Sequence, residues 1–247
     1  MRKKIVLLPL VALAVLTSPA AFALSPDIVI SQVYGGGGNA SATLRNDYIE
    51  LFNRGAAAVN LAGWSVQYTS ATGTGLFSTN VTTLSGTLSP GQYYLVQEAS
   101  GGAVGALLPT PDATGTIAMA AGAGKVIVAN VATGIACNGS STACSAGQLA
   151  QIVDLVGYGP TANFFEGAGP TSPALSSTLG AFRATGGCTE TDNNNTDFAN
   201  ATPSARNTAS PLAPCGGPPP LPTLSINDVA QIETDACLLY TSPSPRD

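Results

Sequence analysis

The sequence DYIELFN at residues 47–53 is followed, after RGAAA at residues 54–58, by VNLAGWSVQY at residues 59–68. The first segment combines aromatic and aliphatic side chains and runs into Asn-Arg-Gly, which predicts a short strand closed by a turn. In the second segment, Trp64, Val66 and Tyr68 alternate with polar residues. Alternation of this kind places the three large side chains on one face of a strand. Both segments therefore predict strands, and the second is expected to turn Trp64 into a core between two sheets.

Four further segments have the composition of short strands and are separated by Gly, Pro, Asn and Ser. They are residues 28–34, 93–96, 125–129 and 153–158. The chain contains 28 Gly and 18 Pro, and only 9% of its residues are charged. No segment beyond residue 23 predicts a helix of ten residues. Short strands between turn-forming residues are typical of an all-β sandwich or barrel.

Residues 1–23 have the three parts of a secretory signal peptide. RKK at residues 2–4 is basic, residues 5–16 are apolar, and AFA at residues 21–23 is a cleavage site that predicts removal after Ala23. The alternative is a short membrane anchor, but no other apolar run approaches the roughly 18 residues that a span needs. We expect an extracellular protein with no membrane segment after cleavage, in which cysteines can pair.

The charged residues argue against catalysis and against nucleic-acid binding. The chain contains no histidine, which excludes Ser-His-Asp and Cys-His catalysis and the HExxH zinc site. Glycine-rich segments at residues 35–38 and 122–126 lack the spacing of phosphate-binding loops, so no cofactor is predicted. Basic residues are too few for a phosphate-binding patch, and the net charge is −5. The carboxylates that remain for chemistry are scattered along the chain, at Glu50, Glu98, Asp154 and Glu166.

The segment DNNNTD at residues 192–197 offers oxygen ligands at alternate positions, which Ca²⁺ favours. An EF-hand is excluded, because its sixth position would be Asp197 instead of Gly and its twelfth would be Pro203. A looser calcium site formed by Asp192, Asn194 and Asp197 is one hypothesis. The alternative is a turn in which these side chains bind backbone N–H groups.

Four cysteines precede a proline-rich segment: Cys137, Cys144, Cys188 and Cys215. A CxxC spacing is absent, which argues against zinc. Four cysteines allow three pairings. Proximity in the sequence favours Cys137–Cys144 and Cys188–Cys215.

The strand segments resemble a known family, the lamin tail domain. DYIELFN at residues 47–53 and VNLAGWSV at residues 59–66 resemble its signature, and LSPGQYYLV at residues 88–96 and VDLVGYG at residues 153–159 resemble later strands. Residues 183–207 resemble the end of the family. The resemblance implies an immunoglobulin-like β-sandwich that is not catalytic.

The resemblance is greatest to N-terminal modules of bacterial secreted proteins, among them extracellular nucleases of the endonuclease/exonuclease/phosphatase type. In those proteins the module is thought to serve binding or targeting. No functional residue is carried over, because the matching residues are those of the scaffold.

Composition divides the rest of the chain. The sandwich domain is predicted over residues 25–215, and prolines at residues 216–222 predict a stiff linker. Residues 223–236 resemble the first strand of a Calx-β-type repeat, or continue the linker. CLLYTSPSPRD at residues 237–247 resembles a translated sequencing adapter and is expected not to belong to the natural protein.

Two functions of different classes fit this sequence. The first is a non-catalytic binding or targeting module at the N-terminus of a larger exported protein, such as a nuclease. The second is an adhesin-like or envelope structural protein with no enzyme domain. The sequence does not identify a partner for either function, and a protein or a cell-surface ligand would fit both.

Overall fold

The structure is a computed structural model that describes residues 25–216. The predicted signal peptide, the segment 223–236 and residues 237–247 lie outside the described residues, as does the linker after Gly216.

The larger of two facing sheets has six strands, and every neighbouring pair is antiparallel except β7 and β8, which are parallel. In spatial order the strands are β12 (Phe198–Ala201), β11 (Gly180–Arg183), β1 (Ile28–Tyr34), β2 (Tyr48–Asn53), β7 (Tyr93–Gln97) and β8 (Ala113–Thr114).

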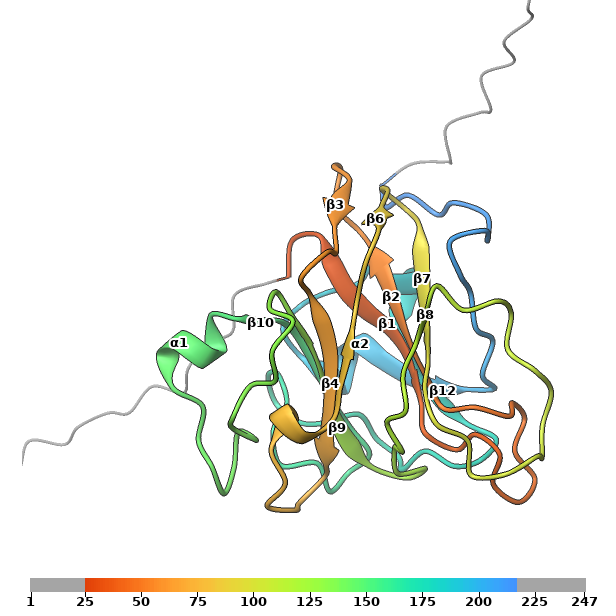
Figure 1. The fold of residues 1–247 in the computed structure, drawn as a ribbon, viewed down its shortest axis with the longest axis horizontal. Helices are drawn as coiled ribbons and strands as arrows, with labels where there is room; N and C mark the ends of the chain where they lie inside the picture. The colour runs from red at the N-terminus through yellow and green to blue at the C-terminus, as the bar shows by residue number, and fades with distance from the viewer. Residues whose placement is uncertain (1–24, 217–247) are drawn as a thin grey trace, which may run out of the picture.

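The second sheet has four antiparallel strands, and a small two-stranded ribbon lies beside the sandwich (Figure 1). The second sheet runs in the order β10 (Ile152–Tyr158), β9 (Gly124–Ala129), β4 (Ser65–Ser70) and β5 (Val81–Thr83), and the ribbon pairs β3 (Val59–Asn60) with β6 (Thr87–Leu88).

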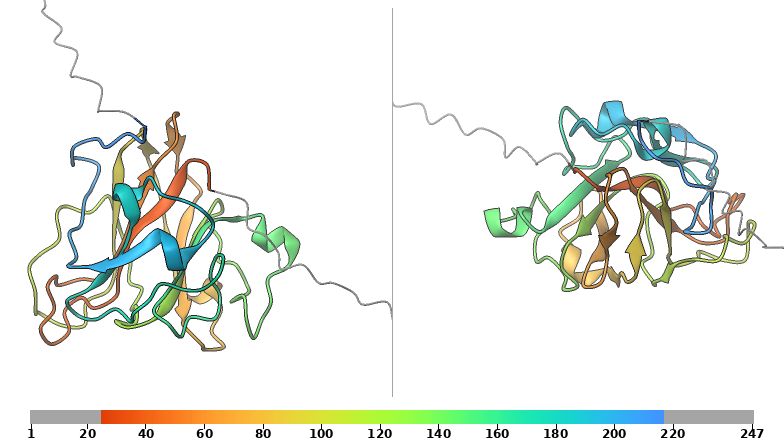
Figure 2. Two further views of the ribbon diagram at one scale, coloured as in Figure 1. Left: turned by 180° about the vertical axis from the view of Figure 1, so that it is seen from behind. Right: turned by 90° about the horizontal axis from the view of Figure 1, so that it is seen from above.

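Helices are single turns at the periphery of the sheets. They are η1 (Phe77–Thr79), α1 (Ala146–Leu149), η2 (Ala184–Gly187) and α2 (Asn194–Asp197). Seen from above, the strands around β4 lie on one side of β1, and the C-terminal segments lie on the other (Figure 2). No helix among residues 25–216 is long and apolar enough to cross a membrane.

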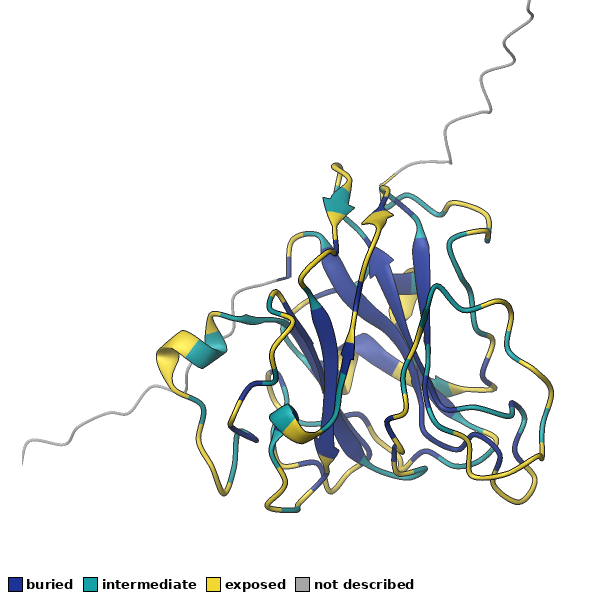
Figure 3. Cartoon of the chain, in the orientation of Figure 1, coloured by how far each residue is buried: buried dark blue, intermediate teal, exposed yellow. Residues whose placement is uncertain are grey.

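The main core lies between the two sheets and confirms the predicted all-β sandwich. Ile30 and Leu51 from the larger sheet pack with Val66, Val126 and Val156 from the smaller one, and all five are fully buried. Figure 3 shows the buried strands enclosed by exposed loops. Burial of these alternating side chains is the main favourable term in folding such a domain.

Trp64 lies differently from the prediction. Val66 and Tyr68 are buried in the inter-sheet core, but Trp64 precedes the first residue of β4 and packs against the edge of the core with part of its surface exposed. The polar residues Ser65 and Gln67 are also fully buried. A loop covers that face of β4, and its carbonyl groups at Val131 and Thr133 accept hydrogen bonds from Ser65 and Gln67.

Two β-bulges interrupt the regular pairing. In β1 the register with β2 shifts between Ile30 and Gln32, and in β10 the register with β9 shifts between Ile152 and Asp154. A bulge re-aims the side chains beside it. The bulge in β10 accompanies the contact between the two sheets, because the Asp154 carboxylate accepts a hydrogen bond from the backbone N–H of Ile30 in β1.

Candidate functional site

Charge is distributed unusually in this domain. Nine of the fifteen charged residues between positions 25 and 216 are buried, and the other six are partly buried. Lys, Arg, Asp and Glu are ordinarily exposed, and each buried charge needs a partner. A functional site that uses charge must therefore be sought in the interior, where eight of the nine buried charges form three groups and Lys125 lies apart from them.

The three residues of the predicted calcium site, Asp192, Asn194 and Asp197, have different hydrogen-bond partners in the structure. The Asn194 side chain accepts hydrogen bonds from the backbone N–H groups of Gly157 and Glu166, and its amide donates to the carbonyl of Leu155 and to the Glu166 carboxylate. Asn194 thus pairs with the free edge of β10 as a neighbouring strand would. Its hydrogen-bonding positions are engaged, because an amide side chain with two accepted and two donated bonds has no further position to offer.

Asp197 and Asp192 do not share the hydrogen bonds that Asn194 forms with β10. Asp197 is buried, and its carboxylate accepts hydrogen bonds from the backbone N–H and the hydroxyl of Thr191. Asp192 is partly exposed and has a backbone φ of 54°, and its Oδ1 atom is buried without a hydrogen-bond partner. Asn194 and Asp197 thus bind backbone N–H groups, which is the contact that the turn interpretation expects.

The first group of charges, here called the Arg183 cluster, joins Arg183 to Asp154, Glu166, Glu190 and Asp197. The Arg183 guanidinium donates to the Asp154 carboxylate at 2.9 and 3.1 Å and to the Glu190 carboxylate, and its Nη1 atom lies 3.6 Å from the Asp197 carboxylate. Its Nε donates to the carbonyl of Ile30 at 2.9 Å. The guanidinium also lies over the Phe198 ring, 4.5 Å from the centroid. One arginine therefore ties strand β11 to β1 and to β10 of the opposite sheet.

The Arg183 cluster contains more carboxyl groups than cations. Burial and the neighbouring Asp154 raise the pKa of Glu166 to about 10, and the same two causes raise the pKa of Glu190 to about 7. Glu166 is therefore protonated at neutral pH, which relieves part of the excess negative charge. Oxygen atoms of Asp154, Glu166 and Glu190 lie within 4.8 Å of one another and are the described carboxylates that could share a cation. Arg183 already supplies the positive charge there, so the geometry fits a structural junction.

The second group joins Glu50 in β2 to Arg206 in the C-terminal segment. Glu50 is fully buried and accepts hydrogen bonds from the Ser31 hydroxyl at 2.6 Å and from the Arg206 guanidinium at 2.7 Å. Arg206 lies over the Tyr93 ring, 3.6 Å from the centroid. Burial raises the pKa of Glu50, and Arg206 opposes that shift. This ion pair fixes the C-terminal segment to the outer face of the larger sheet.

The third group consists of Asp47 and Glu98, which hold loops at one end of the sandwich. The Asp47 carboxylate accepts from the N–H groups of Gly37 and Met119 at 2.8 and 2.9 Å, and Glu98 accepts from the N–H of Ile117 at 2.9 Å. Burial raises the pKa of Asp47 to about 6 and that of Glu98 to about 7. Each carboxylate therefore holds a loop in place by accepting hydrogen bonds from its backbone N–H groups.

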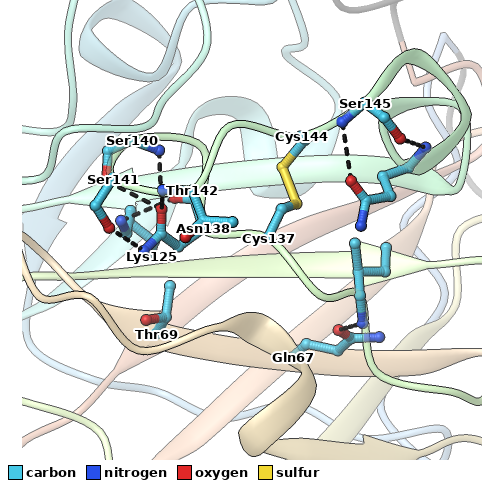
Figure 4. Close-up of a disulfide and its surroundings, with 12 residues drawn as sticks. Gln67, Thr69, Lys125, Cys137, Asn138, Ser140, Ser141, Thr142, Cys144 and Ser145 are labelled. Carbon is cyan, nitrogen blue, oxygen red and sulfur yellow. Dashed lines mark hydrogen bonds between the residues drawn. A yellow bond between two sulfur atoms is a disulfide. The ribbon is translucent and has the colours of Figure 1, made fainter.

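Lys125 in β9 is fully buried beside a disulfide (Figure 4). Its ammonium donates to the carbonyl of Asn138 and to the side chain of Asn163, both at 2.9 Å. Burial lowers the pKa of Lys125 to about 8. No carboxylate among residues 25–216 forms an ion pair with it, so Lys125 is held by amide oxygens alone.

The structure joins Cys137 to Cys144 and Cys188 to Cys215. The first pair closes the loop that accepts from Lys125 (Figure 4). The second pair attaches the C-terminal segment to η2. Arg54 donates both to the carbonyl of Cys188 and to the carbonyl of Ser25, so this disulfide lies close to the first described residue of the chain.

An apolar groove of about 320 Å³, here called the Trp64 groove, lies where β1 and β10 begin. The walls that matter here are the side chains of Ile28, Val59, Trp64, Ile152 and Val153. Ser25, Pro26 and Asp27 complete the lining, and Asp27 is its one charged residue.

The comparison with known families decides the identity of this sandwich. The sequence profile of the lamin tail domain matches residues 23–159, which is more than half of the chain. The chain belongs to the lamin tail domain family.

A solved structure from another family shares the fold of this lamin tail domain protein. It is a DUF4876 family protein from Bacteroides thetaiotaomicron, which superposes with a TM-score of 0.50 at 15% sequence identity and covers 76% of this chain and 74% of its own. At this identity the likeness shows the fold alone. No curated protein matches the chain by sequence.

The lamin tail match ends at Gly159, and the segment 183–207 lies beyond it. Of the Arg183 cluster, only Asp154 lies inside the matched residues, and Arg206 lies outside them as well. The buried ion pairs therefore attach the C-terminal part of the sandwich to the part that the family model covers.

Proposed function

We propose that this lamin tail domain is a non-catalytic binding module of an exported protein, and that the parent protein is an extracellular nuclease. The observation that carries the proposal is that none of the charged residues between positions 25 and 216 is fully exposed. Phosphate binding needs accessible Lys or Arg side chains, and carboxylate catalysis needs accessible acids. The two disulfides support export, because such bonds persist outside the cytosol.

The surface that best suits a protein partner is the loop between β7 and β8. Val104 is 44% exposed and Leu107 is 71% exposed, although both are large apolar residues. The loop is ordered by backbone contacts, since Arg45 donates to the carbonyl of Ala106 at 2.7 Å and Ala106 donates to the carbonyl of Thr43 at 3.0 Å. Apolar side chains on a pre-organised loop lose little entropy when they enter a partner's pocket.

The binding proposal is tested by co-sedimentation of the purified chain with envelope material from the producing organism. We expect the wild-type chain to sediment with the envelope and the variant Val104→Ser/Leu107→Ser to remain in solution. Leu212→Ser is the matched control, because Leu212 is 43% exposed on another part of the chain. Equal sedimentation of all three chains would refute the role of the loop.

The proposal that the domain is not catalytic is tested with plasmid DNA and Mg²⁺, Mn²⁺ or Ca²⁺. We expect no cleavage by the purified chain. Metal-dependent cleavage that a single Asp or Glu substitution abolishes would refute it.

The gene sequence beyond codon 236 tests the proposal that the parent protein is a nuclease. A nuclease domain there supports the proposal, and surface repeats support the adhesin-like alternative.

A further inference from the structure

The Trp64 groove is a described feature that neither the ion pairs nor the proposed binding loop explains. Val59, Trp64 and Val153 pack against the main core from its edge, and each keeps part of its surface exposed. Apolar surface that continues a core outward is stabilised when another apolar group covers it. The question is which group does so.

The first described residue gives the position of that group. Ser25 lines the groove and is only 2% exposed. Its hydroxyl donates to the carbonyl of Val153, and its own carbonyl accepts from Arg54 at 2.9 Å. Ser25 is therefore fixed in place, and the α-carbon of residue 24 must lie about 3.8 Å from that of Ser25.

Residue 24 is a leucine, and it lies outside the described residues. Cleavage after Ala23 would make Leu24 the first residue of the exported chain, with a free α-ammonium group. An N-terminal leucine combines an apolar side chain with a positive charge. The groove offers the complementary pair, an apolar wall around Trp64 and a carboxylate at Asp27.

We propose that the Trp64 groove binds the mature N-terminus. The Leu24 side chain would pack against Trp64, and the ammonium group would lie beside Asp27. This inference rests on the export that the proposed function includes. In the precursor the nitrogen of Leu24 belongs to a peptide bond, so the charged contact forms only after cleavage. Removal of the signal peptide thereby completes the edge of the core.

Trp64 is the only tryptophan in the chain, so its fluorescence reports on the groove alone. We would prepare two chains with defined first residues, one beginning at Leu24 and one at Ser25, by cutting a fusion partner away. In the chain without Leu24, we expect Trp64 emission at longer wavelength and stronger quenching by acrylamide. Its Tm should fall by roughly 3–8 °C, the change that follows from exposing one leucine-sized apolar contact in a domain of this size.

Two variants of the longer chain separate packing from length. Leu24→Met keeps the apolar volume and should behave like the wild type, whereas Leu24→Asp should behave like the chain that begins at Ser25. Identical emission, quenching and Tm in the two starting chains would overturn the inference. So would N-terminal sequencing of the exported protein that found a first residue other than Leu24.

The outcome of the fluorescence and Tm measurements does not depend on the proposed binding function of the loop. These measurements use purified chains and involve neither envelope material nor the loop that carries Leu107. If Leu24 protects Trp64 from quenching but the chain does not sediment with envelopes, the proposed binding of the N-terminus in the Trp64 groove is supported and only the proposal for the loop fails.

Discussion

The Arg183 cluster and the Trp64 groove lie on the same seam, where β1 of one sheet meets β10 of the other. At the cluster, Arg183 bonds to Ile30 and Asp154, one residue from each strand, and the seam is closed by ion pairs. Two residues earlier in each strand, Ile28 and Ile152 line an open apolar groove. This domain therefore uses buried charge to join its sheets and leaves apolar surface at the edge for a further contact.

The largest effect is expected for Arg183→Met, which removes the cation from the closed part of the seam. Asp154 and Glu190 would remain buried without their partner, and an uncompensated buried charge costs about 3–5 kcal/mol of folding free energy. Urea unfolding followed by circular dichroism measures this loss. Arg45→Met is the control, because Arg45 is partly exposed and forms no ion pair with the described residues. A loss below about 1 kcal/mol would show that the cluster does not hold the sheets together.

The disulfides should rank by the length of the loop that each closes. The sequence separation is 27 residues for Cys188–Cys215 and 7 residues for Cys137–Cys144. Loop entropy then gives losses of roughly 3.5 and 2.5 kcal/mol when each pair is replaced by alanine. Removing Cys188–Cys215 should also expose Trp64 to quenching, because Arg54 links Cys188 to Ser25 at the groove. Equal Trp64 quenching in the two variants would break this link between the disulfide and the groove.

The excess carboxyl groups of the cluster predict an unusual dependence of stability on pH. In the folded chain the pKa of Glu166 is raised to about 10 and that of Glu190 to about 7, so both groups bind protons that the unfolded chain has released. Stability is therefore greatest below the ordinary glutamate pKa and declines as pH rises through the folded values. Between pH 5 and pH 8 we expect a loss of no less than about 2 kcal/mol in urea unfolding, because one extra proton held over three pH units corresponds to about 4 kcal/mol. Glu166→Gln should reduce the slope, and stability that increases over this range would contradict the assignment.

The smallest effect is expected at the open part of the seam. Trp64→Phe shortens a partly exposed side chain and should cost about 1 kcal/mol, because little fully buried surface is lost. Tyr158→Phe is a useful contrast, since Tyr158 is fully buried and its hydroxyl donates to the carbonyl of Ala120 at 2.8 Å. If Trp64→Phe lowered the free energy of unfolding more than Tyr158→Phe does, Trp64 would belong to the core after all.

The strands could be predicted from the sequence because their side chains alternate or run continuously apolar. Residues 28–34, for example, form β1 with the bounds expected. The position of Trp64 differs from the prediction because alternation indicates on which face of a strand a side chain lies, but not at which residue the strand begins. The buried polar residue Gln67 was also not foreseen, since the loop that covers it comes from more than sixty positions away.

The Arg183 cluster was missed for the same reason of distance. Arg183 and Asp154 are 29 residues apart, and the guanidinium reaches Ile30 across 153 positions. One signal was available: Asp154 lies within the apolar run VDLVGY, and Glu50 lies within YIELF. A charge in a strand that is apolar on both sides is expected to be buried, and a buried carboxylate needs either a cation or hydrogen-bond donors as partners. In a chain with so few basic residues, Arg183 and Arg206 were among a handful of candidates.

A double-mutant cycle between Asp154 and Arg183 measures whether buried charge joins the two sheets. Unfolding free energies of the wild type, Asp154→Asn, Arg183→Met and the double variant give the interaction energy of the pair. We expect a favourable coupling of about 2 kcal/mol or more at pH 7, because both side chains are fully buried and the guanidinium bonds to both carboxylate oxygens. A coupling below about 0.5 kcal/mol, the range found for independent sites, would contradict it.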